Sequence, residues 1–401
     1  MATSTAGRAL FLICAFAAAV STSYTSHGPI LSLISGDFGL DAASAGAIAT
    51  AFFLGGATTL LFGGTFADRH GARPAVTGGF LVVALSAIAC GVLDPSYQAL
   101  LAWRFVGGLG GGFSFAAGAS YTRSVFSGRG QHLAQGLYGA SFLAGSGSTL
   151  VFMPLLAGPD GDWRRAYILS GLAVLAVWVA WWLVAPPDRA ARARTTPEST
   201  PGIRPALRAR NSWLLALCHM CGFGLAMVAG TWVVTYVARG FGLPLAQAGL
   251  LGSLVLVVGI VARTTGGVLL ERGLPPVRVI RVGLGLAIVG LSTMALTGQL
   301  AGALVGLVAT GLGIGLPYAA VFNGAAASVP ASPAAAQAFV GWGGVLTAIV
   351  GPPLVGVLLD ATGSFESGFL VLALFAVLVL ASTFELRPFS FAPDEPVAAE
   401  P

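Results

Sequence analysis

Two arginines, Arg104 and Arg263, lie inside long apolar stretches of the chain. An arginine within a membrane-spanning segment costs about 3 kcal/mol on insertion scales, and such residues mark ligand pathways or pair with other groups. The planar guanidinium donates two parallel hydrogen bonds to a carboxylate or another planar oxyanion. Both arginines are therefore candidates for binding an anion. As alternatives, Arg104 could extend to the membrane interface, and Arg263 could bond helix-end carbonyls or Asp68.

The chain repeats its own pattern at an offset of 203 positions, and the two arginines are not part of the repeat. Gly63-Gly64 recurs as Gly266-Gly267, and Gly108-Leu109-Gly110 recurs as Gly311-Leu312-Gly313. At the same offset, Arg104 corresponds to Leu307 and Arg263 corresponds to Leu60. Two apolar halves that repeat the same pattern in the same order along the chain suggest a transporter with its substrate site between the halves.

The composition predicts a membrane protein built from helices. The chain is 56% hydrophobic and 9% charged, whereas soluble proteins carry about 25% charged residues. A membrane helix needs roughly 20 apolar residues, and the short alternating segments of a membrane β-barrel are absent from the sequence. Twelve spans are predicted, near residues 9–34, 43–66, 74–93, 98–122, 132–157, 165–185, 212–238, 245–269, 277–297, 299–327, 334–359 and 366–386.

The charges predict how the chain is oriented. All 20 basic residues are arginine, and with a cytoplasmic N-terminus only Arg164, Arg165 and Arg239 fall in outer loops. The excess of positive charge on inner loops favours both termini in the cytoplasm, in the cytoplasmic membrane. The net charge of +5 follows from this asymmetry and indicates no nucleic-acid partner. The first apolar run continues to about Ile34, which favours a retained helix over a cleaved signal peptide.

The polar segment 186–211 separates two apolar parts. It is rich in arginine, proline and threonine and is expected to be a flexible cytoplasmic linker. We therefore expect an N-terminal six-helix half over 1–185 and a C-terminal six-helix half with a short tail over 212–401. The four cysteines fall in predicted spans, so no disulfide framework is indicated.

Metal, nucleotide and enzyme chemistry are not indicated. Cys218 and Cys221 are one helical turn apart, but no companion His/Cys cluster supplies the further ligands that a metal requires. The chain has no lysine, and no phosphate-binding loop of the Gly-x-x-x-x-Gly-Lys type occurs. No cofactor and no enzymatic activity are expected.

The segment between the second and third expected spans carries glycines and charges at fixed spacing: Gly64, Asp68, Arg69, Gly71 and Arg73. It resembles the cytoplasmic loop signature of the major facilitator superfamily, Gly-x-x-x-Asp-Arg/Lys-x-Gly-Arg/Lys-Arg/Lys, and departs from it only at Ala72. The second half carries Glu271 and Arg272 at the matching place. In that family the loop holds the inner gate shut, so the resemblance implies a gating role for these residues. The alternative is a solvated turn with ordinary charges.

Further residues fit the resemblance. Arg104 with Gly108 and Gly110 matches the fourth-helix pattern Arg-x-x-x-Gly-x-Gly of proton-linked members. The surroundings of Arg263 are similar to those in nitrate/nitrite porters of the superfamily. Those porters carry a second cavity arginine in the second helix, and residues 43–66 contain none. Nitrate itself is therefore in doubt.

The family lines its cavity with the first, fourth, seventh and tenth helices, which implies further candidates for contact with substrate. Gly28-Pro29 is expected to interrupt the first helix, because proline lacks an amide donor. Packing or interface anchoring is the alternative for the aromatic residues, and a satisfied buried histidine is the alternative for His27. The candidate residues are Tyr24, His27, Tyr121, Trp232, Tyr236 and Asn323, with Pro317 and Tyr318 beside them.

None of the 15 acidic residues lies near the middle of an expected span. Many proton-coupled members carry a carboxylate there, so coupling here would use His27, an outer carboxylate such as Asp37, or no proton. His27 has the better position, on the kinked first helix.

The expected protein is an all-α membrane protein with the major facilitator fold, twelve helices in two pseudo-symmetric halves, and it is expected to be a monomer. The expected function is secondary transport of a small solute by alternating access, with an organic anion favoured because of the two arginines. One alternative is proton-linked efflux of a drug or natural product, although Gly145 to Ser148 lack the Gly-Pro element of drug antiporters. The other is a membrane sensor that does not transport.

Overall fold

The structure is a computed structural model that describes residues 2–93, 96–126, 129–187, 203–387 and 389. Within these ranges the side chains of some helical residues, Asp68 and Arg69 among them, are outside the description. The described ranges consist of helices joined by short turns and contain no strand.

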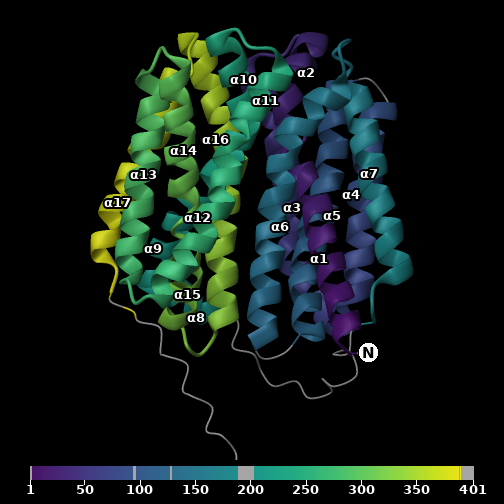
Figure 1. Cartoon of the computed structure of the whole chain (residues 1–401), viewed down its shortest axis with the longest axis vertical. Helices are drawn as coiled ribbons and strands as arrows, with labels where there is room; N and C mark the ends of the chain where they lie inside the picture. Colours follow the sequence, from purple (N-terminus) through teal and green to yellow (C-terminus); the bar gives the residue numbers. More distant parts are fainter. Residues whose placement is uncertain (1, 94–95, 127–128, 188–202, 388, 390–401) are drawn as a thin grey trace, which may run out of the picture.

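The first half of the chain forms one bundle (Figure 1). Its elements are α1 (Ala2–Thr25), the 3-10 turn η1 (Gly28–Ile30), α2 (Leu31–Phe38), α3 (Ala42–His70), α4 (Ala72–Val92), α5 (Tyr97–Val125), α6 (Arg129–Ala157) and α7 (Trp163–Val184).

The second half forms a bundle beside the first (Figure 1). Its elements are α8 (Arg204–Arg208), α9 (Arg210–His219), the π-helical turn η3 (Met220–Gly224), α10 (Leu225–Phe241), α11 (Leu245–Gly252), α12 (Leu254–Glu271), α13 (Pro276–Leu296), α14 (Leu300–Gly315), α15 (Tyr318–Ser328), α16 (Pro333–Thr362), α17 (Glu366–Ser382) and the 3-10 turn η4 (Thr383–Glu385).

Each expected span coincides with one helix or with consecutive pieces of one. Eleven helical segments of the described chain are long and apolar enough to cross a membrane. The remaining expected span, 98–122, is α5, which is 29 residues long and so extends over about 40 Å. Its glycines and Arg104 lower its apolar character. The prediction of an all-α protein with twelve membrane helices is confirmed.

Four of the spans are interrupted, and in the eighth Ser253 separates α11 from α12. In the first, α1 ends at Thr25 and η1 begins at Gly28, as the Gly28-Pro29 pair predicts. In the tenth, α14 and α15 are separated at Leu316 and Pro317. In the seventh, the π-helical turn η3 joins α9 to α10 without a proline. Such π-turns occur in helices mostly as single turns and often lie at functional sites.

The two bundles meet along α3 and α16 through backbone contacts. A Cβ atom on Gly46 would collide with the backbone of Pro352, and one on Gly356 would collide with the carbonyl of Ala42. The hydroxyl of Thr50 donates to the carbonyl of Ile349 at 2.6 Å. The absence of side chains at both glycines therefore allows the two helices to touch across the halves.

At one end of this seam a carboxylate of one half caps a helix of the other. The two carboxylate oxygens of Asp360, on α16, accept the amides of Ala42 and Ala43, both at 2.8 Å. These amides have no partner within α3, because the first amides of any helix lack one. Asp41, the residue before α3, caps the same helix. The hydroxyl and amide of Ser44 donate to the Asp41 carboxylate and hold its pKa below its usual range. We call the contact of Asp360 with α3 the Asp360 clasp.

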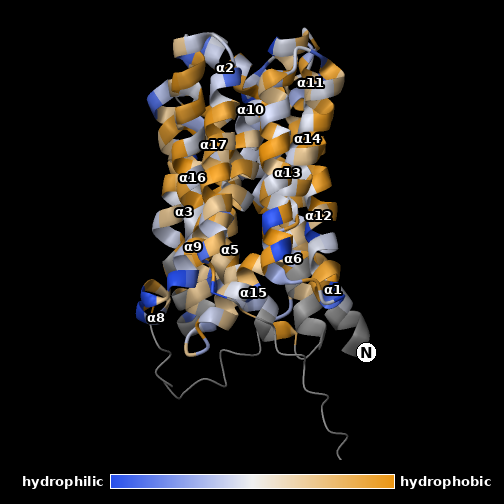
Figure 2. Ribbon diagram, turned by 90° about the vertical axis from the view of Figure 1, so that its left-hand side faces the viewer, coloured by the Kyte–Doolittle hydropathy of each residue, from blue (hydrophilic) through white to orange (hydrophobic). Residues whose placement is uncertain are grey.

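The outer surface along the bundle is apolar. Figure 2 shows mostly hydrophobic residues along the length of the helices, with hydrophilic ones concentrated at the two ends. The large side chains of Phe62, Val261, Val305 and Leu378 are each more than 60% exposed. In water such a surface would favour aggregation, whereas hydrocarbon tails cover it at no cost. The chain is therefore a multi-pass membrane protein.

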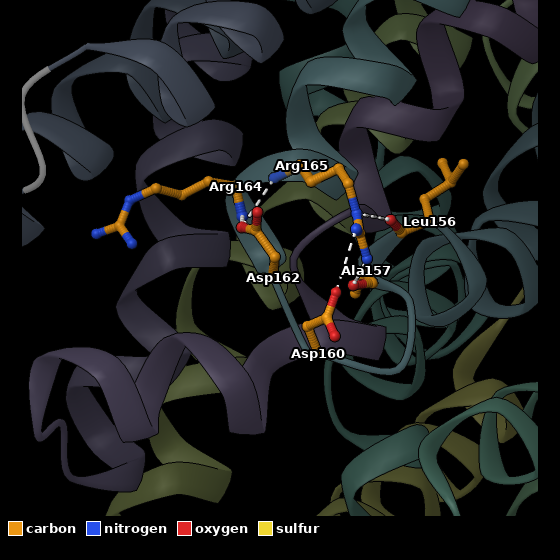
Figure 3. A network of polar contacts seen from close by, with 6 residues as sticks. All are labelled: Leu156, Ala157, Asp160, Asp162, Arg164 and Arg165. Carbon is orange, nitrogen blue, oxygen red and sulfur yellow. Dashed lines mark hydrogen bonds and ion pairs between the residues drawn. The ribbon is translucent and has the colours of Figure 1, made fainter.

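The turn between α6 and α7 is fixed by a small polar network (Figure 3). Asp162 accepts the amides of Arg164 and Arg165, at 3.0 and 3.1 Å, and so caps α7. The side chain of Arg165 bonds the carbonyls of Leu156 and Ala157 at the end of α6. It also pairs with Asp160. The side chain of Arg165 thus satisfies carbonyls at the end of α6, while its amide at the start of α7 is capped by Asp162.

Candidate functional site

Arg104 is buried inside the first bundle, and its nitrogen atoms are almost all bonded there. Nη1 donates to the carbonyl of Ser23 at 2.6 Å and to the hydroxyl of Ser26 at 3.2 Å. Nη2 lies 3.2 Å from Nδ1 of His27. The guanidinium carbon lies 4.5 Å from the centre of the Phe52 ring, and only Nε lacks a partner. Arg104 thus holds the end of α1 against α5.

The hydrogen bonds around His27 have only one consistent direction. A guanidinium cannot accept a hydrogen bond, so Nδ1 of His27 accepts from Arg104 and Nε2 carries the ring proton. Nε2 lies 3.2 Å from Oγ1 of Thr231, on α10, and that hydroxyl donates to the carbonyl of Met227. A continuous chain of hydrogen bonds therefore runs from α5 through the first helix to α10 and joins the two bundles.

Arg263, on α12, is partly exposed and has a different environment. Its guanidinium carbon lies 4.2 Å from the centre of the Tyr318 ring. Its Nε is buried without a hydrogen-bond partner, and none of its three nitrogens hydrogen-bonds a group in the described part of the chain. A guanidinium fixed over a ring with its donors unused can bind an anion, because stacking orients the plane of the fork.

His219 lies near the ring on which Arg263 stacks, at the junction of α9 and the π-helical turn η3. Its ring is 6.2 Å from that of Tyr318 and 4.8 Å from that of Phe322. The imidazole is 5% exposed, and within the described chain it makes no hydrogen bond. Because its ring nitrogens bond no described residue, His219 is a further candidate for contact with a ligand.

Three of the expected aromatic candidates donate hydrogen bonds to backbone carbonyls. The hydroxyl of Tyr121 donates to the carbonyl of Pro186, and that of Tyr236 donates to the carbonyl of Met294. The indole of Trp232 donates to the carbonyl of Pro352. All three side chains are buried. The structure therefore gives each of them a packing environment and does not bring them to Arg263.

Tyr24 and Asn323 lie in two different surroundings. The Tyr24 ring is buried and packs edge-on against Phe52 at 4.7 Å and Phe142 at 4.8 Å. Asn323 is exposed on α15. Of the expected site residues, the structure brings Arg104 and His27 together, and it places Arg263 in a separate group.

The expected gating residues lie at the junction of α3 with α4 and at the end of α12. Gly71 has φ of 100°, a backbone conformation that favours glycine, and Arg73 donates to the carbonyl of Trp182. Glu271 and Arg272 are exposed. The side chains of Asp68 and Arg69, and the surroundings of Gly64, lie outside the described part of the structure.

Asp37, the second coupling candidate, forms an ion pair at the end of the first bundle. Its Oδ2 lies 2.9 Å from Arg164 and accepts from the indole of Trp163 at 3.1 Å. Both charged side chains are more than a third exposed, so solvent weakens this pair.

Sequence reasoning did not select His219 as a site residue and mentioned Tyr318 only in passing. His219 lies within the Cys218–Cys221 pair, which directed attention to metal binding. Both cysteines are buried, and among the described residues no group of three or more His, Cys, Asp or Glu could hold a metal ion. The available signal was positional: His219 precedes two glycines on the first helix of its half, as His27 precedes Gly28.

Comparison with known proteins gives a consistent family. The family model described as Major Facilitator Superfamily matches residues 11–335. A probable nitrate/nitrite antiporter of Thermus thermophilus is 27% identical over 375 residues, which cover 85% of this chain and 83% of that protein. A probable sulfoacetate transporter of Cupriavidus necator is 26% identical over 381 residues, which cover 88% of this chain and 87% of that protein.

A solved structure has the same fold. It is that of a bacterial homologue of the human lysosomal transporter Spinster, in an inward-facing and unoccupied conformation. The match has a TM-score of 0.78 and 18% identity, and it covers 95% of this chain and 96% of the other.

Proposed function

The chain belongs to the major facilitator superfamily and is a membrane transporter of small solutes, and from this premise we propose that its substrate is a small organic anion. The observation that carries the proposal is Arg263, a guanidinium stacked on Tyr318 whose donors have no partner in the described chain. A buried donor left without a partner costs about 1–3 kcal/mol. A bound carboxylate or sulfonate would recover that cost and supply a charge-assisted, two-pronged hydrogen bond.

The relatives support an anion and leave its identity open. One is named for nitrate and nitrite and another for sulfoacetate, and all three are oxyanions. Within this chain, α3 has no arginine before Arg69, so a second cavity arginine on the second span is lacking. An organic anion needs only one guanidinium for its single carboxylate, which agrees better with this arrangement than nitrate does.

Transport by alternating access would move the two bundles against each other. The contacts that would have to break in one state include the Asp360 clasp and the bond of His27 to Thr231. At the opposite end, Gly64, Asp68, Arg69, Gly71 and Arg73, with Glu271 and Arg272, would form the gate. In this proposal the carboxylate of Asp68 stabilises one of the two states and not the other.

If transport is coupled to a proton, we propose that the proton binds His27 rather than Asp37. A proton added to Nδ1 of His27 would remove the acceptor from Arg104 and place a second positive charge 3.2 Å from its guanidinium. Protonation would therefore oppose the state described here and favour one in which His27 leaves Arg104. Asp37 is paired with Arg164 at the end of the bundle, away from this chain of hydrogen bonds.

The proposed setting is the cytoplasmic membrane, with the protein as a monomer and both termini on the cytoplasmic side. In this orientation the ends of α3 and α12 that carry the gating residues face the cytoplasm, and the Asp360 clasp faces outward. Arg69, Arg73 and Arg272 then follow the positive-inside rule.

The test compares binding to wild type with binding to Arg263→Lys. Purified protein is screened by thermal shift against sodium salts of organic acids and against lipophilic cations, and hits are followed as uptake into proteoliposomes. Because lysine keeps the charge and loses the planar fork, we expect anion affinity to fall by about tenfold or more. Arg281→Lys is the matched control, since Arg281 also stacks on a ring, that of Phe384 at 4.1 Å, while bonding Thr383.

Two results would overturn the proposal. One is transport of a cation or a neutral compound that Arg263→Ala leaves unchanged, which would favour efflux of a drug or natural product. The other is a wild-type protein that binds no anion while the fold is intact by size-exclusion chromatography.

A further inference from the structure

We infer that Arg263, His219 and Tyr318 form one subsite for an organic anion with a flat apolar body, in which His219 is the second polar ligand and aromatic rings from both halves hold the body. This inference rests on the proposed function and makes it narrower. It predicts that the subsite binds a benzoate-like anion more tightly than acetate or an inorganic oxyanion.

The polar end of the subsite is built around Tyr318. Arg263 lies over the face of this ring at 4.2 Å, and the His219 ring is 6.2 Å away with the two planes tilted by 56°. The guanidinium and the imidazole therefore flank the same ring. In this proposal a carboxylate on the Arg263 fork also accepts a hydrogen bond from His219, since a neutral imidazole always carries one ring N–H.

The position of His219 depends on an unusual stretch of helix. The π-helical turn of Met220–Gly224 follows it directly and contains no proline. A π-turn adds one residue to the helical turn, which changes the direction in which the preceding side chains point. The extra residue is unfavourable for a regular helix, and the distortion is explained if it places His219 near Tyr318, the ring on which Arg263 stacks.

The apolar part of the subsite comes from both halves. Phe322 meets the His219 ring edge-on at 4.8 Å, and Phe223 stacks against it at 6.0 Å. Phe223 in turn lies 6.4 Å from Phe53 and 6.3 Å from Phe142, two residues of the first bundle. The rings therefore continue from the polar group across the boundary between the halves.

Two glycines lie close to the outer ends of the Tyr318 and Phe322 rings. A Cβ atom added to Gly139, on α6, would have only the Tyr318 hydroxyl near it, at 3.7 Å. One added to Gly341, on α16, would have only the Phe322 ring, at 4.0 Å. Glycine at both places leaves space free of other atoms beside the Tyr318 hydroxyl and the tip of the Phe322 ring. A flat apolar group can pack against aromatic rings there, whereas acetate and nitrate have no comparable apolar surface.

The experiment measures the affinities of benzoate, acetate and nitrate for the full-length protein in detergent, by thermal shift and by calorimetry. Because the ring of benzoate buries apolar area that acetate lacks, we expect benzoate to bind at least about tenfold more tightly than acetate. His219→Phe should weaken both carboxylates by about tenfold and keep their ratio, and His219→Gln, which restores a donor, should recover most of the loss.

Phe223→Leu should reduce the preference for benzoate over acetate to about threefold or less. Phe365→Leu is the control, since Phe365 packs on Trp232 and Tyr236 in the same half and should leave the ratio unchanged. Size-exclusion profiles and melting without ligand identify any variant that has not folded, and His219→Gln then decides the role of His219.

The outcomes separate this inference from the proposed function. Equal affinities of the wild type for benzoate and acetate would overturn the inference alone, as would His219→Phe binding both carboxylates like wild type while Arg263→Lys weakens them. Absence of binding by every anion would overturn the proposed function together with the inference.

Discussion

Each half of the molecule contains one arginine beside one histidine, and the two pairs differ in what they bond. Arg104 and Arg263 each stack on an aromatic ring, at 4.5 and 4.2 Å. His27 and His219 each lie on the first membrane helix of their half, where that helix is interrupted. In the first pair the guanidinium donates three hydrogen bonds and both imidazole nitrogens are used. In the second pair no hydrogen bond to the described residues is formed.

This difference separates two uses of the same chemistry. Apart from Nε of Arg104, the Arg104–His27 pair satisfies itself, so a ligand that used the other nitrogens would have to break existing hydrogen bonds. The donors of Arg263 and His219 bond no described residue, so a ligand could form hydrogen bonds with them without breaking existing ones. An intramembrane arginine is therefore informative about substrate only when its partners are known, and the sequence does not contain them.

The largest expected effect on stability is that of Arg104→Met. Three hydrogen bonds to a charged group, each worth about 1.5–3 kcal/mol, would be lost, and part of this would be offset because no buried charge remains. We expect the free energy of unfolding to fall by about 3 kcal/mol, measured by thermal melting and denaturant titration in detergent.

Arg281→Met, at the end of α13, is the control for Arg104→Met and should cost less than about 1 kcal/mol, because Arg281 is at a bundle end where water replaces its contacts. Equal losses in the two variants would mean that the Arg104 network contributes nothing particular to the fold.

Arg263→Met should have the opposite profile. Stability should change by less than about 1 kcal/mol, because only the cation–π contact with Tyr318 is lost and an unpaired charge is removed. Anion affinity should fall by about fiftyfold, since a charge-assisted bidentate bond disappears. Melting curves with and without benzoate measure both quantities on one sample. A loss of stability as large as that of Arg104→Met would contradict the assignment of Arg263 to ligand binding.

His27→Gln tests whether the self-satisfied pair also serves in coupling. Glutamine can accept from Arg104 and donate to Thr231 through its amide, so stability should fall by no more than about 1 kcal/mol. It cannot take up the proton, so accumulation driven by a pH gradient should disappear while exchange of substrate across the membrane continues. Proteoliposomes with and without an imposed pH gradient decide this. Accumulation at the wild-type level would remove His27 from coupling and leave Asp37 or transport without a proton.

The smallest expected effect is that of Thr231→Val, which removes one hydrogen bond between the halves. Valine keeps the shape of threonine, so the cost is that of the bond of His27 to Thr231, about 1 kcal/mol. The state in which the two halves are joined through His27 and Thr231 should become about fivefold less populated relative to the state in which the halves are apart. Spin labels at Gln98→Cys on α5 and Gln247→Cys on α11, in a background without other cysteines, would show a larger fraction of molecules with a long distance between the two labels. An unchanged distribution would show that this bond does not bias the two states.

Much of the fold could be predicted, because membrane helices are recognised by length and apolar content. The spans fell within a few residues of the helices, and Gly28-Pro29 identified the break after α1 because proline cannot donate. The π-helical turn at Met220–Gly224 could not be predicted, since its five residues are ordinary helix formers and glycines. His219 directly precedes this turn, so its orientation could not be predicted from the sequence either.

The rotation of each helix is the second piece of information that the sequence lacks. A helix that is apolar on all sides has no polar stripe to show which face meets its neighbours. The sequence therefore could not show that the polar groups of Tyr121, Trp232 and Tyr236 bond backbone carbonyls, and their contact with substrate stays a prediction. Arg104 could be assigned as intramembrane, but its acceptors are a backbone carbonyl, a hydroxyl and an imidazole that only the folded chain brings together.

The Asp360 clasp offers an intrinsic reporter of the motion between the halves. The amides of Ala42 and Ala43 are protected only because a carboxylate from the other bundle accepts them. Whenever the bundles separate at this end, these two amides become accessible to water and can exchange hydrogen for deuterium. Their exchange rate would thus follow the fraction of time that this end is open, in unlabelled protein and without knowledge of the substrate.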